Sequence, residues 1–148
     1  MTARTGVTQG LRMGVWMAAG IGFGWHNHDF EFVPTADGAI PQAEIFKGGP
    51  DLEWEMDVAW VVRGGADPFA WIEQEKSRIT AAHVKDIAPA GQNLDQDGWS
   101  DVGAGTVPWA RLLPALRAIG VQHFVMEHDN PKDDAGFAAA SIAAVKGY

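Results

Sequence analysis

Short apolar runs alternate with helical segments along most of the chain. Four runs have the length and pattern of β-strands. The clearest is residues 52–58, where Leu52, Trp54 and Met56 alternate with Glu53, Glu55 and Asp57. The four predicted strands cover Ile21–His26, Leu52–Val58, Ile79–Val84 and Val121–Met126. Strands that alternate with helices predict a parallel sheet of the α/β class.

Start and stop signals define the helices around these strands. Asp67 and Pro68 form a strong helix opening, with Asp at the N-cap and Pro in the first turn. This helix should run to about Lys76. The other predicted helices are Val7–Ala19 with Gly20 as its stop, Val107–Ile119 closed by Gly120, and a last helix that Asp133 and Asp134 open and that runs to about Lys146. The segment from about Ala88 to Gly105 is predicted to be a loop.

Residues that can carry acid, base or metal chemistry stand at the carboxyl end of every predicted strand. They are His26 and His28, Asp57, His83 and Lys85, and Glu127 and Asp129. Successive sites are about 34 residues apart on average, close to the roughly 31 residues per unit of an eight-unit TIM barrel, whose active site lies at the carboxyl ends of its strands. The chain has room for four units. We therefore predict one domain, residues 1–148, with the architecture of a half-barrel.

The composition narrows the classes of protein that fit. Hydrophobic residues make up 47% and charged residues 20%, which favours a packed core over disorder. The formal net charge of −8 disfavours a nucleic-acid binder. The absence of cysteine excludes disulfides and thiolate chemistry and suits a reducing compartment, so we expect a cytoplasmic location. The uncharged stretch Met13–His28 is too short and too rich in glycine for a membrane span.

Two imidazoles and two carboxylates stand out among the strand-end residues. His26, Asp57, His83 and Glu127 together form a nitrogen and oxygen donor set that suits a divalent ion. Each residue alone is a weak signal, because a strand-end Asp or His more often forms a turn or satisfies a local hydrogen bond. Their common position at strand ends strengthens the prediction of a metal site.

Five motifs in order resemble the xylose isomerase-like TIM barrels, also called the sugar phosphate isomerase/epimerase family. The motifs are Gly24–Phe32 (GWHNHDFEF), Glu55–Val61 (EMDVAWV), Ala82–Asp86 (AHVKD), Val102–Gly105 with Trp109, and Met126–Asp129 (MEHD). The resemblance covers the chain from about Gly20 onward. It implies that the four units are strands five to eight of the barrel, its carboxyl-terminal half.

The resemblance also implies roles for particular residues. The metal ligands would be His26, Asp57, His83 and Glu127, with Mn²⁺ the expected ion and Mg²⁺, Co²⁺ or Zn²⁺ as alternatives. Because much of the family has a glutamate at the first position, Glu31 is the alternative to His26. His28 would be an acid/base residue, with Lys85 and Glu127 completing the catalytic set. Trp25 and Trp60 would line the substrate pocket.

The implied activity is metal-assisted proton transfer next to a carbonyl of a sugar, keto-sugar or cyclitol. The ion is a Lewis acid, a positioned imidazole or carboxylate moves the proton, and the ammonium of Lys85 stabilises the developing oxyanion. Isomerisation, epimerisation and dehydration all remain open outcomes. A DNA-repair nuclease of the same superfamily is disfavoured by the net charge of −8.

Several neighbouring residues have simpler interpretations. Asp86 and Asp129 are expected to cap loops or pair with Lys85, and the glycines at 103 and 105 to form a turn before a helix, since they lack the spacing of a phosphate-binding loop. Glu53 and Glu55 share the face of Asp57, where a solvated or lysine-paired carboxylate is the common outcome.

A half-barrel leaves two sheet edges and its strand interior uncovered. We therefore predict a homo-oligomer that completes the barrel and binds a small sugar, with neither a nucleic-acid nor a membrane partner. The rival interpretation is a non-catalytic half-barrel, either a stable fragment or the assembly partner of a separate amino-terminal half. Asp57 and Glu127 turned toward other partners would favour this rival.

Overall fold

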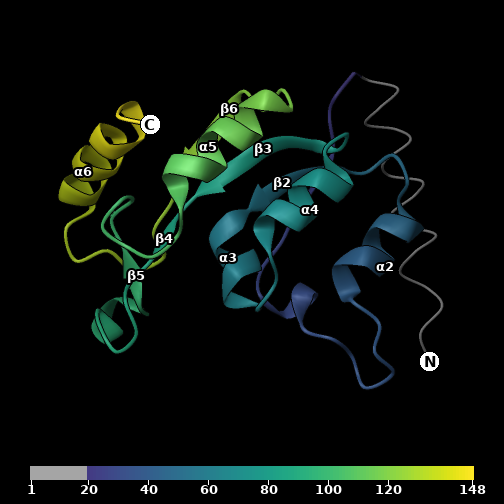
Figure 1. Ribbon diagram of the computed structural model, residues 1–148, viewed down its shortest axis with the longest axis horizontal. Coiled ribbons are helices and arrows are strands. Elements are labelled where there is room, and N and C mark those ends of the chain that lie inside the picture. Colours follow the sequence, from purple (N-terminus) through teal and green to yellow (C-terminus); the bar gives the residue numbers. More distant parts are fainter. Residues whose placement is uncertain (1–19) are drawn as a thin grey trace.

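Four parallel strands form the central sheet of the protein. The computed structural model describes residues 20–148, so the helix predicted over Val7–Ala19 lies outside the described residues. The strands are β1 (Gly24–His26), β2 (Glu53–Asp57), β3 (Ile79–Val84) and β6 (His123–Met126), in the spatial order β1-β2-β3-β6. Every neighbouring pair is parallel (Figure 1). The predicted half-barrel of α/β class is confirmed, with β1 and β6 shorter than their apolar runs.

Helices connect the strands, and three of them lie within two residues of their predicted bounds. The helices are α2 (Pro41–Gly48), α3 (Val58–Arg63), α4 (Pro68–Glu75), α5 (Trp109–Ala118) and α6 (Asp134–Lys146). The side chain of Asp67 caps α4 by accepting a hydrogen bond from the amide of Phe69, and Asp133 caps α6 in the same way. None of the helices in the described part of the chain has the length and apolar character that crossing a membrane requires.

The sequence analysis predicted neither α2 nor helix α3. Val58 was predicted as the end of a strand, yet it is the first residue of this helix. The three valines and the tryptophan of α3 favour strands by intrinsic propensity. Two tertiary effects override that preference: the Asp57 carboxylate caps the helix at the amide of Trp60, and Val58, Ala59 and Val61 are fully buried.

The hydrophobic core lies between the sheet and its helices. Trp54 and Met56 of β2 and Ala82 and Val84 of β3 point to this side and are completely buried. They pack with Leu112, Leu113 and Leu116 of α5, whose spacing places them on one helix face. The indole of Trp54 meets the rings of Phe46 and Trp71 edge to face, at centroid distances of 5.2 and 6.0 Å.

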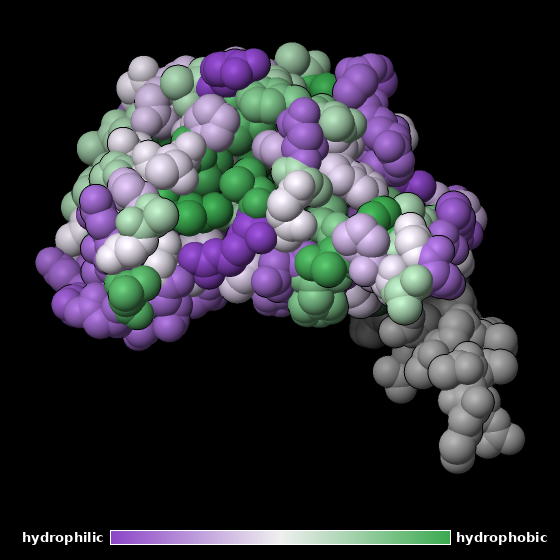
Figure 2. All heavy atoms as spheres, turned by 60° about the horizontal axis from the view of Figure 1, so that its bottom comes forward, coloured by the Kyte–Doolittle hydropathy of each residue, from purple (hydrophilic) through white to green (hydrophobic). Residues whose placement is uncertain are grey.

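The other face of the sheet carries polar and partly exposed side chains. Glu53 and Glu55 of β2 and His83 of β3 are half-buried, while Val125 of β6 is 42% exposed. Because side chains alternate across a strand, this face is the one that would point into a closed barrel. Figure 2 shows an apolar area in the middle of one side of the molecule, bordered by hydrophilic residues.

A small antiparallel ribbon extends the carboxyl end of β3. It pairs β4 (Asp86–Ile87) with β5 (Trp99–Ser100), and the short 3₁₀ helix η2 (Leu94–Gln96) lies between them. The Asp86 carboxylate accepts hydrogen bonds from the amides of Gly103, Gly105 and Val107. A Cβ at Gly105 would lie 2.2 Å from Asp86 Oδ1, so this approach requires glycine. The predicted loop cap at Asp86 and the turn before α5 are confirmed.

Candidate metal centre

Four side chains converge at the carboxyl edge of the sheet. His26 ends β1, Asp57 ends β2, His83 lies near the end of β3, and Glu127 follows β6. Each offers one ligand atom, and these atoms all lie within 4.8 Å of one another. Donors bound to one ion at about 2.0–2.3 Å can be up to roughly 4.5 Å apart, so the four groups are near the spacing that one ion needs.

Hydrogen bonds to a buried asparagine hold the ends of β1 and β2 together. The Oδ1 atom of Asn27 accepts from the amide of Asp57 at 2.9 Å and from the indole of Trp54 at 2.8 Å, while its Nδ2 donates to the carbonyl of Asp57 at 3.0 Å. Asn27 has no exposed surface. It thereby fixes Asp57 beside His26, a role that the sequence analysis did not find because Asn27 stands between two histidines with stronger chemical signals.

His83 lies at the middle of the cluster, with a carboxylate near each ring nitrogen. Its Nδ1 forms a hydrogen bond with Glu127 and lies 3.9 Å from Asp57 Oδ2. Its Nε2 lies 3.2 Å from Oε1 of Glu55. Glu55 therefore faces the cluster rather than lying free in solvent or pairing with a lysine, which was the more common outcome expected for it.

The ammonium of Lys85 lies beneath the same carboxylates. Lys85 Nζ is 2.6 Å from Asp129, 3.5 Å from Glu127 and 3.8 Å from Asp57, and the side chain is entirely buried. It also lies over the indole of Trp99 at 4.3 Å. The expected pairing of Asp129 with Lys85 is confirmed. The carboxylates around the site thus outnumber the ammonium of Lys85 by four to one. They are those of Glu55, Asp57, Glu127 and Asp129. This excess of negative charge attracts a cation.

The protonation equilibria follow from burial and from these contacts. Burial raises the pKa of Asp57 to about 6, although Lys85 acts in the opposite direction. The hydrogen bond from His83 lowers the pKa of Glu127 to about 2. For His83, burial alone would lower the pKa, but the hydrogen bond and the charge of Glu127 outweigh it and raise the value. Burial and the neighbouring charge of His83 lower the pKa of His26.

Two buried atoms that could be metal ligands have no hydrogen-bond partner among the described residues. They are Nδ1 of His26 and Oδ2 of Asp57. Buried polar atoms without partners are costly, and a neutral imidazole and an ionised carboxylate are the forms that bind metals. The donor set and these two free atoms fit a divalent ion.

The remaining predicted site residues lie outside the cluster of four. The exposed ring of His28 lies 5.2 Å from that of His26 and 5.3 Å from that of Trp60, measured between centroids. Glu31 is buried and outside the cluster: it accepts from the indole of Trp25 at 3.2 Å and from the amide of His28 at 2.8 Å. The structure thus brings His26, and not Glu31, to the other three groups.

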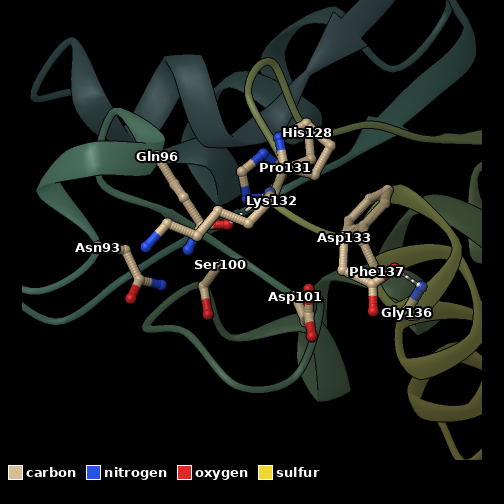
Figure 3. A pocket seen from close by; sticks show the side chains of 10 residues that line it. All are labelled: Asn93, Gln96, Ser100, Asp101, His128, Pro131, Lys132, Asp133, Gly136 and Phe137. Atoms are coloured by element: carbon tan, nitrogen blue, oxygen red, sulfur yellow. Dashed lines mark hydrogen bonds between the residues drawn. The ribbon is translucent and has the colours of Figure 1, made fainter.

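A polar pocket lies between the segment that follows β4 and the segment that follows β6. It has a volume of about 280 Å³ and is lined by residues of the ranges 93–101 and 128–137 (Figure 3). The amide of Lys132 donates to Gln96 and joins the two segments. The ammonium of Lys132 pairs with Asp95, so its charge is compensated. His128 lines the pocket and directly follows Glu127 of the cluster.

Solved structures with the same fold bear the names of sugar isomerases, epimerases and a probable dehydratase. No protein-family model matches the sequence, and neither does any curated protein. A sugar phosphate isomerase/epimerase from Parabacteroides distasonis is 27% identical, with a TM-score of 0.66 over 90% of this chain and 48% of that one. The fold is that of a xylose isomerase-like half-barrel.

Two further solved structures share the fold of the half-barrel at lower identity. The 3-keto-D-glucoside 4-epimerase YcjR from E. coli is 15% identical, with a TM-score of 0.67 over 97% of this chain and 52% of that one. The probable 3-DHS dehydratase AsbF from Bacillus anthracis is 16% identical, with a TM-score of 0.65 over 93% and 53%. The half-barrel therefore spans about half the length of the solved structures that it matches.

Proposed function

We propose that the half-barrel carries a divalent-metal centre for proton transfer next to a carbonyl of a sugar, keto-sugar or cyclitol. The observation that carries this proposal is the convergence of His26, Asp57, His83 and Glu127 at one edge of the sheet. The proposed ion is Mn²⁺, with Mg²⁺, Co²⁺ and Zn²⁺ as alternatives, because the set mixes imidazole nitrogens with carboxylate oxygens. Once bound, the ion would supply Lewis acidity that weakens the C–H bond next to the carbonyl.

The protein groups around the centre have separable tasks in this proposal. His28 is exposed beside the cluster, so its imidazole can take up or return the proton at the substrate carbon. Glu127 is half-buried and is the second candidate for moving a proton, in addition to its role as a ligand. Lys85 is entirely buried, which favours compensation of the carboxylate charge over contact with the substrate. Trp60, whose ring lies 5.3 Å from that of His28, would form a wall of the substrate site, whereas Trp25 packs against the hydrophobic core.

The structural relatives support a sugar as the substrate class. Two of the three bear names of sugar isomerases or epimerases and the third that of a dehydratase, so the direction of the reaction stays open. The non-catalytic alternative is not favoured, since Asp57 and Glu127 face the cluster.

Metal titration tests the proposal. We expect Mn²⁺, monitored by calorimetry on protein first treated with EDTA, to bind with one site per chain and to raise the melting temperature. His83→Ala should abolish binding. His123→Ala is the matched control, because His123 is an exposed histidine of β6 outside the cluster. Absence of binding by Mn²⁺, Co²⁺ and Zn²⁺ at millimolar concentration would refute the metal centre.

Substrate chemistry is tested by proton exchange. A 3-keto-glucoside and a ketohexose incubated with the Mn²⁺-loaded protein in D₂O should lose the proton NMR signal of the carbon next to the carbonyl. The His28→Ala variant should bind Mn²⁺ normally and exchange that proton more slowly by about 10²–10⁴-fold. Equal exchange by the variant and the unmodified protein would remove His28 from the proposal.

We also propose that a second copy of the chain covers the open face of the sheet. Strands β1 and β6 are the two edges of the four-stranded sheet, and Val125 of β6 is 42% exposed on the open face. Exposed edges and apolar surface favour association. Light scattering should give a mass near twice 15.9 kDa. Val125→Asp should shift the mass toward the monomer, and a monomeric unmodified chain would contradict this proposal.

A further inference from the structure

A second glutamate of β2 faces the histidine at the middle of the cluster. Glu55 precedes Asp57 by two residues, so both side chains leave the strand on the same face. In the sheet register Glu55 pairs with Ala81, and Asp57 pairs with His83. The Glu55 carboxylate lies beside His83, two residues beyond Ala81 along β3.

The two nitrogens of His83 face different carboxylates. Nδ1 faces Glu127 and, at 3.9 Å, Oδ2 of Asp57, which are both groups of the convergent set. Nε2 faces Oε1 of Glu55 at 3.2 Å. Glu55 is not among the four groups whose donor atoms converge. Nδ1 therefore faces two groups of the convergent set, whereas Nε2 faces a carboxylate outside it.

We infer that Glu55 is a positioning residue for the metal centre: its carboxylate accepts a hydrogen bond from the Nε2–H group of His83, which keeps the proton on Nε2 and leaves Nδ1 free for the ion. This inference rests on the proposed metal centre. A neutral imidazole has one protonated and one free nitrogen, and the group that accepts the hydrogen bond from the N–H decides which nitrogen keeps the proton. Carboxylates that act in this way on ligand histidines orient the ring and raise its basicity.

A pair of glutamates on the same face provides a matched test. Glu55→Ala should weaken Zn²⁺ binding by about 10–100-fold, and Glu55→Gln should lose less, because an amide oxygen can still accept the hydrogen bond from Nε2–H. Glu53→Ala is the control. It removes the same charge from the same face of β2 two residues earlier, and in the structure Glu53 contacts Thr80 rather than His83. Zn²⁺ affinity of this control should match that of the unmodified chain.

Nitrogen-15 NMR of histidine-labelled protein gives a readout independent of affinity and of activity. The chain has five histidines, and the His83→Ala spectrum assigns the signal of His83. With Zn²⁺ bound, we expect His83 to coordinate through Nδ1 and to keep its proton on Nε2. Coordination through Nε2 would overturn the inference, and so would equal Zn²⁺ affinity of Glu55→Ala and Glu53→Ala.

The outcomes also separate this inference from the proposed function. If the unmodified chain binds Zn²⁺ and either of these contrary results is found, the metal centre stands and the role of Glu55 falls. If the unmodified chain binds no metal, both fall together. The melting temperatures of the metal-free variants should stay equal to that of the unmodified chain, so that a change in affinity reports on the site.

Discussion

Replacing Asp57 by Asn should make the metal-free protein more stable at neutral pH. Asp57 is completely buried, and burial raises its pKa from 3.8 to about 6. The native protein therefore holds the proton of Asp57 more tightly than the unfolded chain does. Between these two pKa values the native state binds more protons, so the free energy of unfolding falls as the pH rises. The cost of ionising Asp57 is fully present above about pH 6.

The size of this effect follows from the difference in pKa. Roughly two pKa units at about 1.4 kcal/mol each give a loss of about 3 kcal/mol between acidic and neutral pH. The amide side chain of the Asp57→Asn variant carries no charge and escapes this loss, while its oxygen can still accept the hydrogen bond from the amide of Trp60 that caps α3. The variant should gain stability relative to the unmodified chain as the pH rises.

Urea unfolding with EDTA present, at pH values from 4 to 7.5, measures the difference. We expect Asp57→Asn to match the unmodified chain at pH 4 and to exceed it by up to about 3 kcal/mol at pH 7.5. Adding Mn²⁺ at 100 times its dissociation constant should raise the stability of the unmodified chain by about 2.7 kcal/mol and leave the variant unchanged. If the unmodified chain instead gains stability over the variant with rising pH, the burial argument is wrong.

Two further predictions concern the groups that support the centre. Gly105→Ala should lower the free energy of unfolding by about 1–3 kcal/mol in chemical denaturation, because its Cβ would lie 2.2 Å from the Asp86 carboxylate. Gly48→Ala is the control and should be neutral or stabilising, because no atom lies within 4 Å of the new Cβ. Asn27→Ala should cost more than about 2 kcal/mol in the same assay and weaken Mn²⁺ binding in calorimetry, because it leaves buried donors unpaired, while the exposed Asn130→Ala should change neither. A stable Asn27→Ala variant with normal affinity would contradict the role assigned to Asn27.

Local signals predicted the elements whose ends are set by short-range chemistry. Asp67 with Pro68, and Asp133 with Asp134, mark α4 and α6 within a residue or two, since caps act on neighbouring amides. The run Ile79–Val84 coincides with β3 because its β-branched and apolar residues stop at Lys85. Helix α3 was missed because its residues favour strands locally, and only burial against the sheet makes them helical.

Sequence spacing could not predict which side chains contact the imidazole ring of His83. The sequence offers His26 and Glu31 for the same position, five residues apart. Only the fold separates them: Glu31 turns back to Trp25 and to the amide of His28, while His26 stays at the end of β1 beside His83. The side chain of Glu55 likewise contacts His83, which lies two residues beyond its register partner Ala81.

The sequence by itself determined the parallel α/β half-barrel and the strand ends at which its chemical groups stand. Alternation, caps and glycine stops act over a few residues, so they are readable along the chain. The tertiary structure decided which of these groups meet, how deeply each is buried and which nitrogen of His83 faces the cluster. These properties depend on strand order and register, which join residues 26 to 127 across the sheet and have no local signature.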